Sequence, residues 1–110
     1  MIDESIIRTV ADRLLAAAPA GSKVILFGSY ARGQADSRSD LDFLVVEPQV
    51  PNRLAEMVRL REAVEPVVAP LRIGVDVLVT SAATFDYWRD TPNTVYYRVV
   101  KEGKAHEPVG

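Results

Sequence analysis

Aspartates at three positions and one glycine–serine pair are the residues of this sequence whose types and spacing could carry out chemistry. Asp40 and Asp42 stand where an apolar segment begins, and the two-residue period of a strand would place both carboxylates on one face. Aspartate is depleted in strands, and carboxylates held side by side repel each other unless a positive group lies between them. A divalent cation is the simplest such group.

Asp76 repeats this anomaly in a second apolar segment, IGVDVLV. The segment reads as continuously buried, so an unpaired charge within it would be costly. If the strands that carry Asp42 and Asp76 are neighbours, these two carboxylates and that of Asp40 converge on one point. Hard oxygen ligands of this kind suit Mg²⁺ or Mn²⁺, and Mg²⁺ commonly shares its coordination shell with phosphates and water.

Gly28 and Ser29 directly follow the apolar run KVILF. A residue without Cβ lets backbone N–H groups approach a phosphate closely, and a serine hydroxyl adds a further donor. Arg32 and Gly33 extend the same loop, where the arginine could neutralise phosphate charge. The pattern therefore indicates a phosphate-binding loop next to the predicted metal site.

Purely structural roles are the alternative for each of these residues. A Gly-Ser pair alone usually forms a turn, and Arg32 could be a solvated loop charge. Asp40 could cap a strand or helix, and Asp42 could pair with Arg38 or Arg32. Asp76 could be a buried residue bonded to the backbone. The combination of all three carboxylates favours the metal site over these readings.

Hydrophobic periodicity and capping residues predict the elements that must position this site. The first half of the chain is expected to form a helix over 3–18 capped by Asp3 and ended by Pro19 and Gly21, a strand over 23–29, a polar loop or single helical turn over 30–39, and a buried strand over 40–47. The second half is expected to form an amphipathic helix over 52–65, a break at Pro66 and Pro70, and a buried strand over 72–80. A short helix capped by Thr80 or Ser81 that ends near Arg89 and a last helix from Pro92 to about Glu102 should follow.

The helix over 52–65 is predicted from five apolar residues on a helical period. The five apolar residues are Leu54, Met57, Val58, Leu60 and Val64.

Together the elements predict an α/β (α+β) fold, with a small mixed β-sheet of three or more strands packed against helices. The chain is expected to form a single domain over 1–110, with a C-terminal tail from about residue 104 that includes His106.

Composition narrows the classes of function. The net charge of −2 and the pI near 5.3 lack the basic excess needed to hold a polynucleotide backbone, so no nucleic-acid template is expected. The absence of cysteine excludes disulfides, thiol catalysis and thiolate zinc sites. The acidic first residues and the lack of a long apolar run predict neither a secretory signal nor a membrane contact. A cytoplasmic location is expected.

The spacing of these residues resembles a known family. Gly28-Ser29, ten residues, and then Asp40-x-Asp42 is similar to the G-S-x₁₀-D-x-D signature of the polymerase-β-like nucleotidyltransferase superfamily. The segments GSYARG and SDLDFLVV, together with the ending TPNTVYYRVVKEGKAHE, resemble its minimal (MNT-type) members. Such members are commonly the antitoxin of a HEPN/MNT toxin–antitoxin pair. Asp76 corresponds to the third family aspartate, on a later strand.

The resemblance implies a fold, an activity and roles for individual residues. A nucleoside monophosphate, AMP if the substrate is ATP, would pass from a nucleoside triphosphate to a hydroxyl, with Mg²⁺ or Mn²⁺ as two bound ions. Asp40 and Asp42 would hold the metals, and Asp76 would hold the catalytic metal and help remove the acceptor's proton. Gly28 and Ser29, with Arg32, would bind the triphosphate.

The acceptor implied by this resemblance is a hydroxyl, most plausibly a tyrosine, on a HEPN-type toxin partner. Two other functions stay open on the sequence alone. One is a non-catalytic binding module that neutralises a partner by contact, and the other is a nucleotidyltransferase acting on a small molecule such as an antibiotic.

Overall fold

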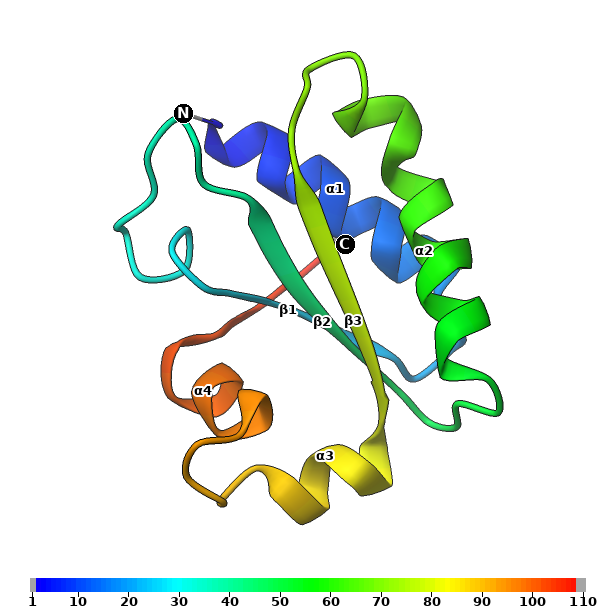
Figure 1. Cartoon of the computed structure of the whole chain (residues 1–110). Coiled ribbons are helices and arrows are strands. Elements are labelled where there is room, and N and C mark those ends of the chain that lie inside the picture. The colour runs from blue at the N-terminus through cyan, green and yellow to red at the C-terminus, as the bar shows by residue number, and fades with distance from the viewer. Residues whose placement is uncertain (1, 109–110) are drawn as a thin grey trace.

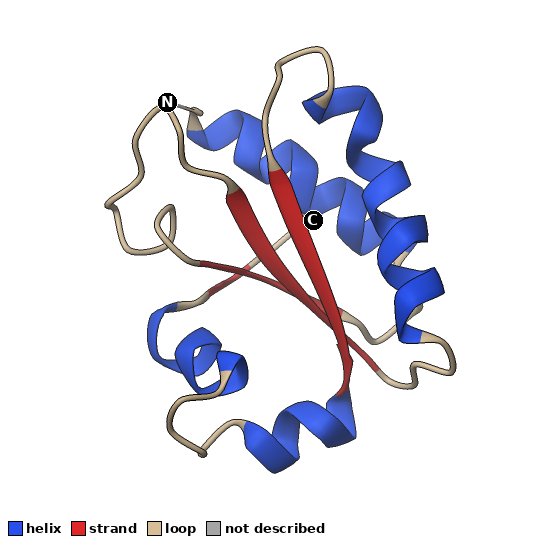
Figure 2. Ribbon diagram, viewed as in Figure 1, coloured by secondary structure: helices blue, strands red, loops and turns tan. Residues whose placement is uncertain are grey.

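The computed structural model describes residues 2–108, which form a four-stranded mixed sheet with two helices on each face (Figure 1). Figure 2 shows the same layers, with the strands between the two pairs of helices. This architecture confirms the predicted α/β (α+β) class. In chain order the elements are α1 (Glu4–Ala17), β1 (Lys23–Phe27), β2 (Leu41–Glu47), α2 (Arg53–Val68), β3 (Val75–Ser81), α3 (Ala82–Trp88), α4 (Val95–Glu102) and β4 (Lys104–Ala105).

The sheet has the strand order β3-β2-β1-β4. Strand β1 pairs with β2 in the antiparallel sense, and Phe27 lies opposite Asp42. Strand β3 runs parallel to β2, so Asp42 lies opposite Asp76. This register brings the C-terminal end of β1, the N-terminal ends of β2 and β3, and the segment after β1 to the same end of the sheet.

Side-chain caps begin the helices. The Asp3 carboxylate accepts a hydrogen bond from the Ile6 amide at 3.1 Å, as predicted for the start of α1. The Ser81 hydroxyl accepts from the Thr84 amide at 3.1 Å, which confirms the predicted cap of α3. These caps satisfy amides that have no partner within the helix.

Apolar residues form one core on each side of the sheet. The larger core lies between the sheet and the helices α1 and α2, and the smaller one lies between the sheet and α3 and α4 (Figure 1). Alternation along β2 explains the division, because Phe43 and Val45 face α1 and α2 while Leu44 and Val46 face the opposite way. Asp42 therefore faces the side of α3 and α4.

Helix α2 differs from the prediction in its end and in its buried face. It continues through Pro66 to Val68, because a proline in the last turn removes only one backbone hydrogen bond. Leu54 and Val58, predicted on the buried stripe, are 71% and 52% exposed. The residues that pack on the sheet are Leu60, Val64 and Val68, which repeat every four residues along one side.

The last predicted elements are also corrected by the structure. Pro92 lies in a turn, and α4 begins only after its cap Thr94, whose hydroxyl accepts from the Tyr97 amide at 3.1 Å. The predicted tail from residue 104 begins instead with β4, which pairs with β1. His106 is fixed as well, since its Nε2 lies 2.6 Å from Asp12 Oδ1. Pairing with β1 is a long-range contact that local periodicity does not reveal.

No helix within residues 2–108 has the length and apolar character that crossing a membrane requires.

Candidate active site

Asp42 and Asp76 form the centre of the site. They are direct neighbours across the parallel pair β2 and β3, and their side chains project from the same face of the sheet. Gly28 closes the other side of Asp42, because any Cβ at this position would clash with the Asp42 carboxylate. Gly28 also has a φ of +77°, a conformation that favours glycine. The glycine of the Gly-Ser pair thus makes room for an aspartate.

The surroundings of Asp42 make its negative charge costly. Burial raises the pKa of Asp42 from 3.8 to about 6, and the charge of Asp76, a hydrogen bond with that carboxyl and the charge of Asp40 act in the same direction. The charge of Arg98 opposes this shift. Without a cation between the two carboxylates, Asp42 therefore keeps its proton up to a pH of about 6.

Asp40 directly precedes β2 and turns its carboxylate toward Gly74. A Cβ at Gly74 would clash with the Asp40 oxygens, so a second glycine accommodates a second aspartate. Within residues 2–108, no group of three or more His, Cys, Asp or Glu side chains is arranged to hold a metal ion. The structure thus brings Asp42 and Asp76 together, and the role of all three aspartates as metal ligands stays a prediction.

The expectation that Asp76 is buried is wrong. Its side chain is exposed, whereas its neighbours Val75 and Val77 are buried. The reason is that β3 lies at the edge of the sheet, so residues on the α3 and α4 side are covered only near Leu78. The charge of Asp76 therefore costs less than the apolar sequence around it suggested, and the side chain is accessible.

The segment after β1 folds into turns rather than a helix. The Arg32 amide donates to the Gly28 carbonyl at 3.1 Å, and the Gln34 amide donates to the Ser29 carbonyl at 2.9 Å. These bonds bring the Arg32 side chain back beside Gly28. The three residues predicted to bind phosphate, Gly28, Ser29 and Arg32, therefore lie in one tight loop at the end of the sheet where Asp42 is located.

Two residues of α4, Glu102 and Arg98, were missed by the sequence analysis. The Glu102 carboxylate accepts hydrogen bonds from the Gly28 amide at 3.2 Å and from Arg32 Nη1 at 3.1 Å. Arg98 Nη2 lies 3.6 Å from Glu102. An arginine and a glutamate four residues apart at the end of the last predicted helix were the available signal, but this pairing is common on solvated helices. Only the tertiary fold places it against the loop.

The donor set of the site fits a hard divalent cation. Asp42 and Asp76 offer carboxylate oxygens, which Mg²⁺ and Mn²⁺ prefer. Burial and the charge of Asp76 raise the pKa of Asp42, and the charge of Arg98 offsets this shift only in part, so a further positive charge would be favourable here. A cation bound between the two carboxylates would replace the retained proton.

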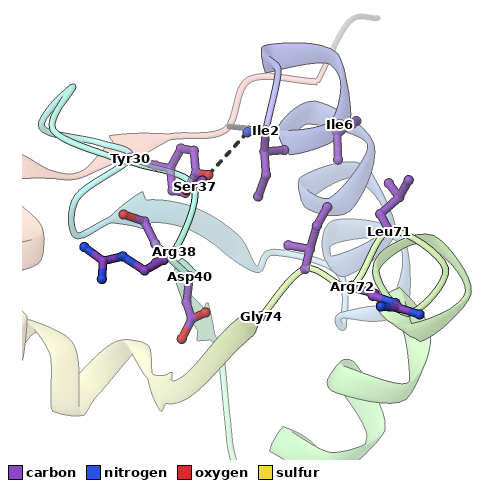
Figure 3. A pocket seen from close by; sticks show the side chains of 11 residues that line it. Ile2, Ile6, Tyr30, Ser37, Arg38, Asp40, Leu71, Arg72 and Gly74 are labelled. Carbon is purple, nitrogen blue, oxygen red and sulfur yellow. Dashed lines mark hydrogen bonds between the residues drawn. The ribbon is translucent and has the colours of Figure 1, made fainter.

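A cavity of about 580 Å³ opens beside Asp40. Figure 3 shows the apolar side chains of Ile2, Ile6 and Leu71 on one side of it and Arg38 and Asp40 on the other. The Tyr30 hydroxyl accepts a hydrogen bond from the Ile2 amide at 3.3 Å and so ties the loop after β1 to the start of the chain. Asp40 lines this cavity, whereas Asp42 and Asp76 do not.

Solved structures with the same fold include toxin–antitoxin complexes. A toxin–antitoxin with AMP-PNP has a TM-score of 0.63 at 22% identity, over 98% of this chain and 75% of that chain. A tri-AMPylated Shewanella oneidensis HEPN toxin in complex with MNT antitoxin has a TM-score of 0.59 at 18% identity, over 98% and 74%. A minimal nucleotidyltransferase has a TM-score of 0.62 at 26% identity, over 98% and 97%.

Comparison with curated proteins gave no match. The family model described as a nucleotidyltransferase domain matches residues 7–107, almost the whole described chain. This match includes the loop after β1, both strands with the aspartates and α4. The resemblance inferred from the Gly-Ser and Asp-x-Asp spacing is thereby confirmed, and the chain belongs to the nucleotidyltransferase domain family.

Proposed function

We propose that this protein transfers AMP from ATP to a hydroxyl group of a protein partner, and that a HEPN-type toxin is that partner. The observation that carries the proposal is the pairing of Asp42 with Asp76 directly beside Gly28. This pairing joins a candidate cation site to a candidate phosphate site. The fold shared with toxin–antitoxin complexes, one of which contains an AMPylated HEPN toxin, supports the choice of acceptor.

The roles of the residues follow from their positions. Gly28 and Ser29 would hold the phosphates through backbone and hydroxyl donors, and Arg32 would neutralise their charge. Asp40 and Asp42, with Asp76, would hold Mg²⁺ or Mn²⁺ as two ions. When bound, such ions stabilise the attacking and the leaving oxygens of an in-line displacement.

The reaction forms a bond between the acceptor oxygen and the α-phosphorus of ATP. The bond from that phosphorus to the β-phosphate oxygen breaks, and pyrophosphate leaves. The acceptor hydroxyl loses its proton to the Asp76 carboxylate, which is exposed on the edge strand and can pass the proton to water. An accessible edge position suits an acceptor that is itself part of another protein.

The test is a labelling reaction with this protein, Mg²⁺ and the product of the neighbouring gene, which the proposal expects to be a HEPN toxin. ATP labelled at the α-phosphate is expected to label the toxin, whereas ATP labelled at the γ-phosphate is not, because only AMP is transferred. The double variant Asp40→Asn with Asp42→Asn should abolish the label. Asp90→Asn, at an exposed position of the turn after α3, is the matched control.

Other outcomes point to the two alternative functions. Neutralisation of the toxin by the double variant, with no label in any reaction, would identify a non-catalytic binding module. Label on an aminoglycoside in the absence of any protein partner would identify a small-molecule nucleotidyltransferase. Either result would overturn the proposal.

A further inference from the structure

The Glu102 carboxylate fills the loop that is predicted to bind phosphates. Its Oε1 accepts hydrogen bonds from the Gly28 amide at 3.2 Å and from Arg32 Nη1 at 3.1 Å, and its Oε2 lies 3.2 Å from the same nitrogen. Arg98 Nη2 lies 3.6 Å from Oε1. The Glu102 carboxylate therefore binds a backbone amide and lies against two guanidinium groups at the same time.

These donors are the ones that a phosphate group would use. Backbone N–H groups and arginine side chains bind carboxylates and phosphates alike, through charge-assisted hydrogen bonds. Burial by itself would raise the pKa of Glu102, but the hydrogen bonds from Arg32 and Gly28 and the charges of Arg32 and Arg98 outweigh it and lower that pKa. Glu102 is thus an anion in the place expected for an anionic ligand.

We propose that Glu102 occupies the position of the nucleotide phosphates in the free protein, and that Arg98 joins Arg32 in binding those phosphates once Glu102 has moved away. This inference rests on the proposed function, because it concerns the same site. It assigns a binding role to Arg98 and a competing role to Glu102. The last helix thereby regulates entry of the nucleotide.

The exchange requires a side-chain rotation and no movement of the helix. The end of α4 is fixed, because the Gly103 amide donates to the Val99 carbonyl at 2.8 Å and Lys104 pairs with Leu26 in the sheet. The Glu102 side chain can instead rotate about its own bonds toward solvent, where 19% of its surface already lies. Removal of the carboxylate leaves the donors of the loop in place for a new anion.

Arg98 is suited to change partners. It lies one helical turn before Glu102, and 55% of its side-chain surface is exposed, so it can reorient without disturbing the core. Its contact with Glu102, which accepts from the Gly28 amide, places the guanidinium beside the loop that lies against Asp42. A triphosphate bound at the loop of Gly28, beside Asp42, would therefore lie near both Arg32 and Arg98.

The test measures binding of Mg-ATP by isothermal titration calorimetry to the whole chain. Because the ligand must displace Glu102, we expect Glu102→Ala to bind Mg-ATP about 3–10-fold more tightly than the unmodified protein. Glu102→Gln keeps the size of the side chain and should give a smaller gain. Glu65→Gln, at an exposed position of α2 on the other face of the sheet, removes the same charge and should bind as the unmodified protein does.

The role of Arg98 is tested in the background without Glu102. Arg98→Ala combined with Glu102→Ala should lose most of the gained affinity, whereas Arg89→Ala in the same background should not. Thermal unfolding of each variant checks that it folds. If Glu102→Ala does not fold, Glu102→Gln, which can still accept the Gly28 hydrogen bond, carries the test.

Inorganic tripolyphosphate with Mg²⁺ separates this inference from the proposed function. The inference would be overturned, and the proposed function left intact, if both Glu102 variants bound Mg-ATP and tripolyphosphate no more tightly than the unmodified protein does. Tighter binding of tripolyphosphate to the variants, without binding of Mg-ATP to any form, would support the competing role of Glu102 and overturn the proposed function.

Discussion

Each end of β2 carries an acidic side chain that lies against a second acidic side chain from another element. The two resulting pairs are stabilised in different ways. At the start of β2, Asp42 meets Asp76 on the face covered by α3 and α4. At its end, Glu47 meets Glu56 of α2 on the opposite face. Glu47 is only 2% exposed, whereas Asp76 is exposed. Both pairs place like charges together, so each requires a proton or a cation.

The pair at the end of β2 has its own cation. Arg59 Nε and Nη2 donate to the two oxygens of Glu56 at 2.7 and 2.8 Å. The hydrogen bond from Arg59 lowers the pKa of Glu56 to about 2, with a further contribution from Glu47. Burial raises the pKa of Glu47 to about 7, and the contact with Glu56 adds to this shift. Glu56 thus has a cation of its own, whereas Glu47 Oε2 is buried without a hydrogen-bond partner among residues 2–108.

Within residues 2–108, neither Asp42 nor Asp76 forms a salt bridge with an arginine. Arg32 and Arg98 both contact Glu102 instead. We infer that the accessible pair is arranged for an external cation, whereas the buried pair has an arginine of the chain itself.

The largest expected effect separates the two pairs by activity. Asp42→Asn should reduce AMP transfer at least about 100-fold, because it removes a proposed metal ligand and the negative charge that attracts the cation. Glu47→Gln should retain activity, because it lies at the other end of the strand. Labelling of the toxin under identical conditions measures both. A fully active Asp42→Asn variant would contradict the assignment.

The next effect concerns stability and pH at the buried pair. The pKa of Glu47 is raised from 4.5 to about 7, so stability that is present below pH 4.5 is lost as the pH rises through about 7. Glu47→Gln stays neutral and should be about 1–3 kcal/mol more stable than the unmodified protein near pH 8, with no difference near pH 4. Urea unfolding at both pH values measures this, and Glu65→Gln is the control.

A smaller effect is expected when the cation of the buried pair is removed. Arg59→Ala should destabilise the fold by about 1 kcal/mol near pH 8, because half of the Arg59 side chain is exposed and solvent screens the interaction. Arg61→Ala, at an exposed position of the same helix, should change the free energy of unfolding by less than about 0.5 kcal/mol. Equal effects of the two variants would show that Arg59 does not stabilise the pair.

The smallest effect sharpens the description of the accessible pair. Asp76→Asn removes the neighbouring charge, so the pKa of Asp42 should fall from about 6 toward 3.8, while the shift caused by burial remains. Carbon-detected NMR titration of the aspartate side chains measures this change. Asp90→Asn should leave the midpoint of Asp42 unchanged. An unchanged midpoint in Asp76→Asn would show that burial alone raises it.

Much of the fold and of the site could be predicted from the sequence because the signals were local. Asp3 and Ser81 are caps whose side chains bond to amides three residues later. Gly28 and the spacing of Asp40 and Asp42 were singled out from the sequence as a phosphate-binding loop and a metal site. That Gly28 also makes room for the Asp42 carboxylate is visible only in the structure.

The features that were not predicted depend on tertiary contacts. The outward orientation of Leu54 and Val58 depends on which side of α2 meets the sheet, and the apolar residues of the helix allowed either side. The exposure of Asp76 depends on strand order, since an apolar strand at the centre of a sheet would have buried it. Glu102 reaches Gly28 across 74 residues of sequence. Periodicity carries no information about such pairings.

The position of β3 at the edge of the sheet also affects the solubility of the protein. An edge strand rich in valine offers unpaired backbone groups on which a second molecule could add a strand and begin aggregation. A charged side chain within such a strand is a common protection against this association. Asp76 supplies that charge, so replacing it with valine would endanger the solubility of the chain as well as its chemistry.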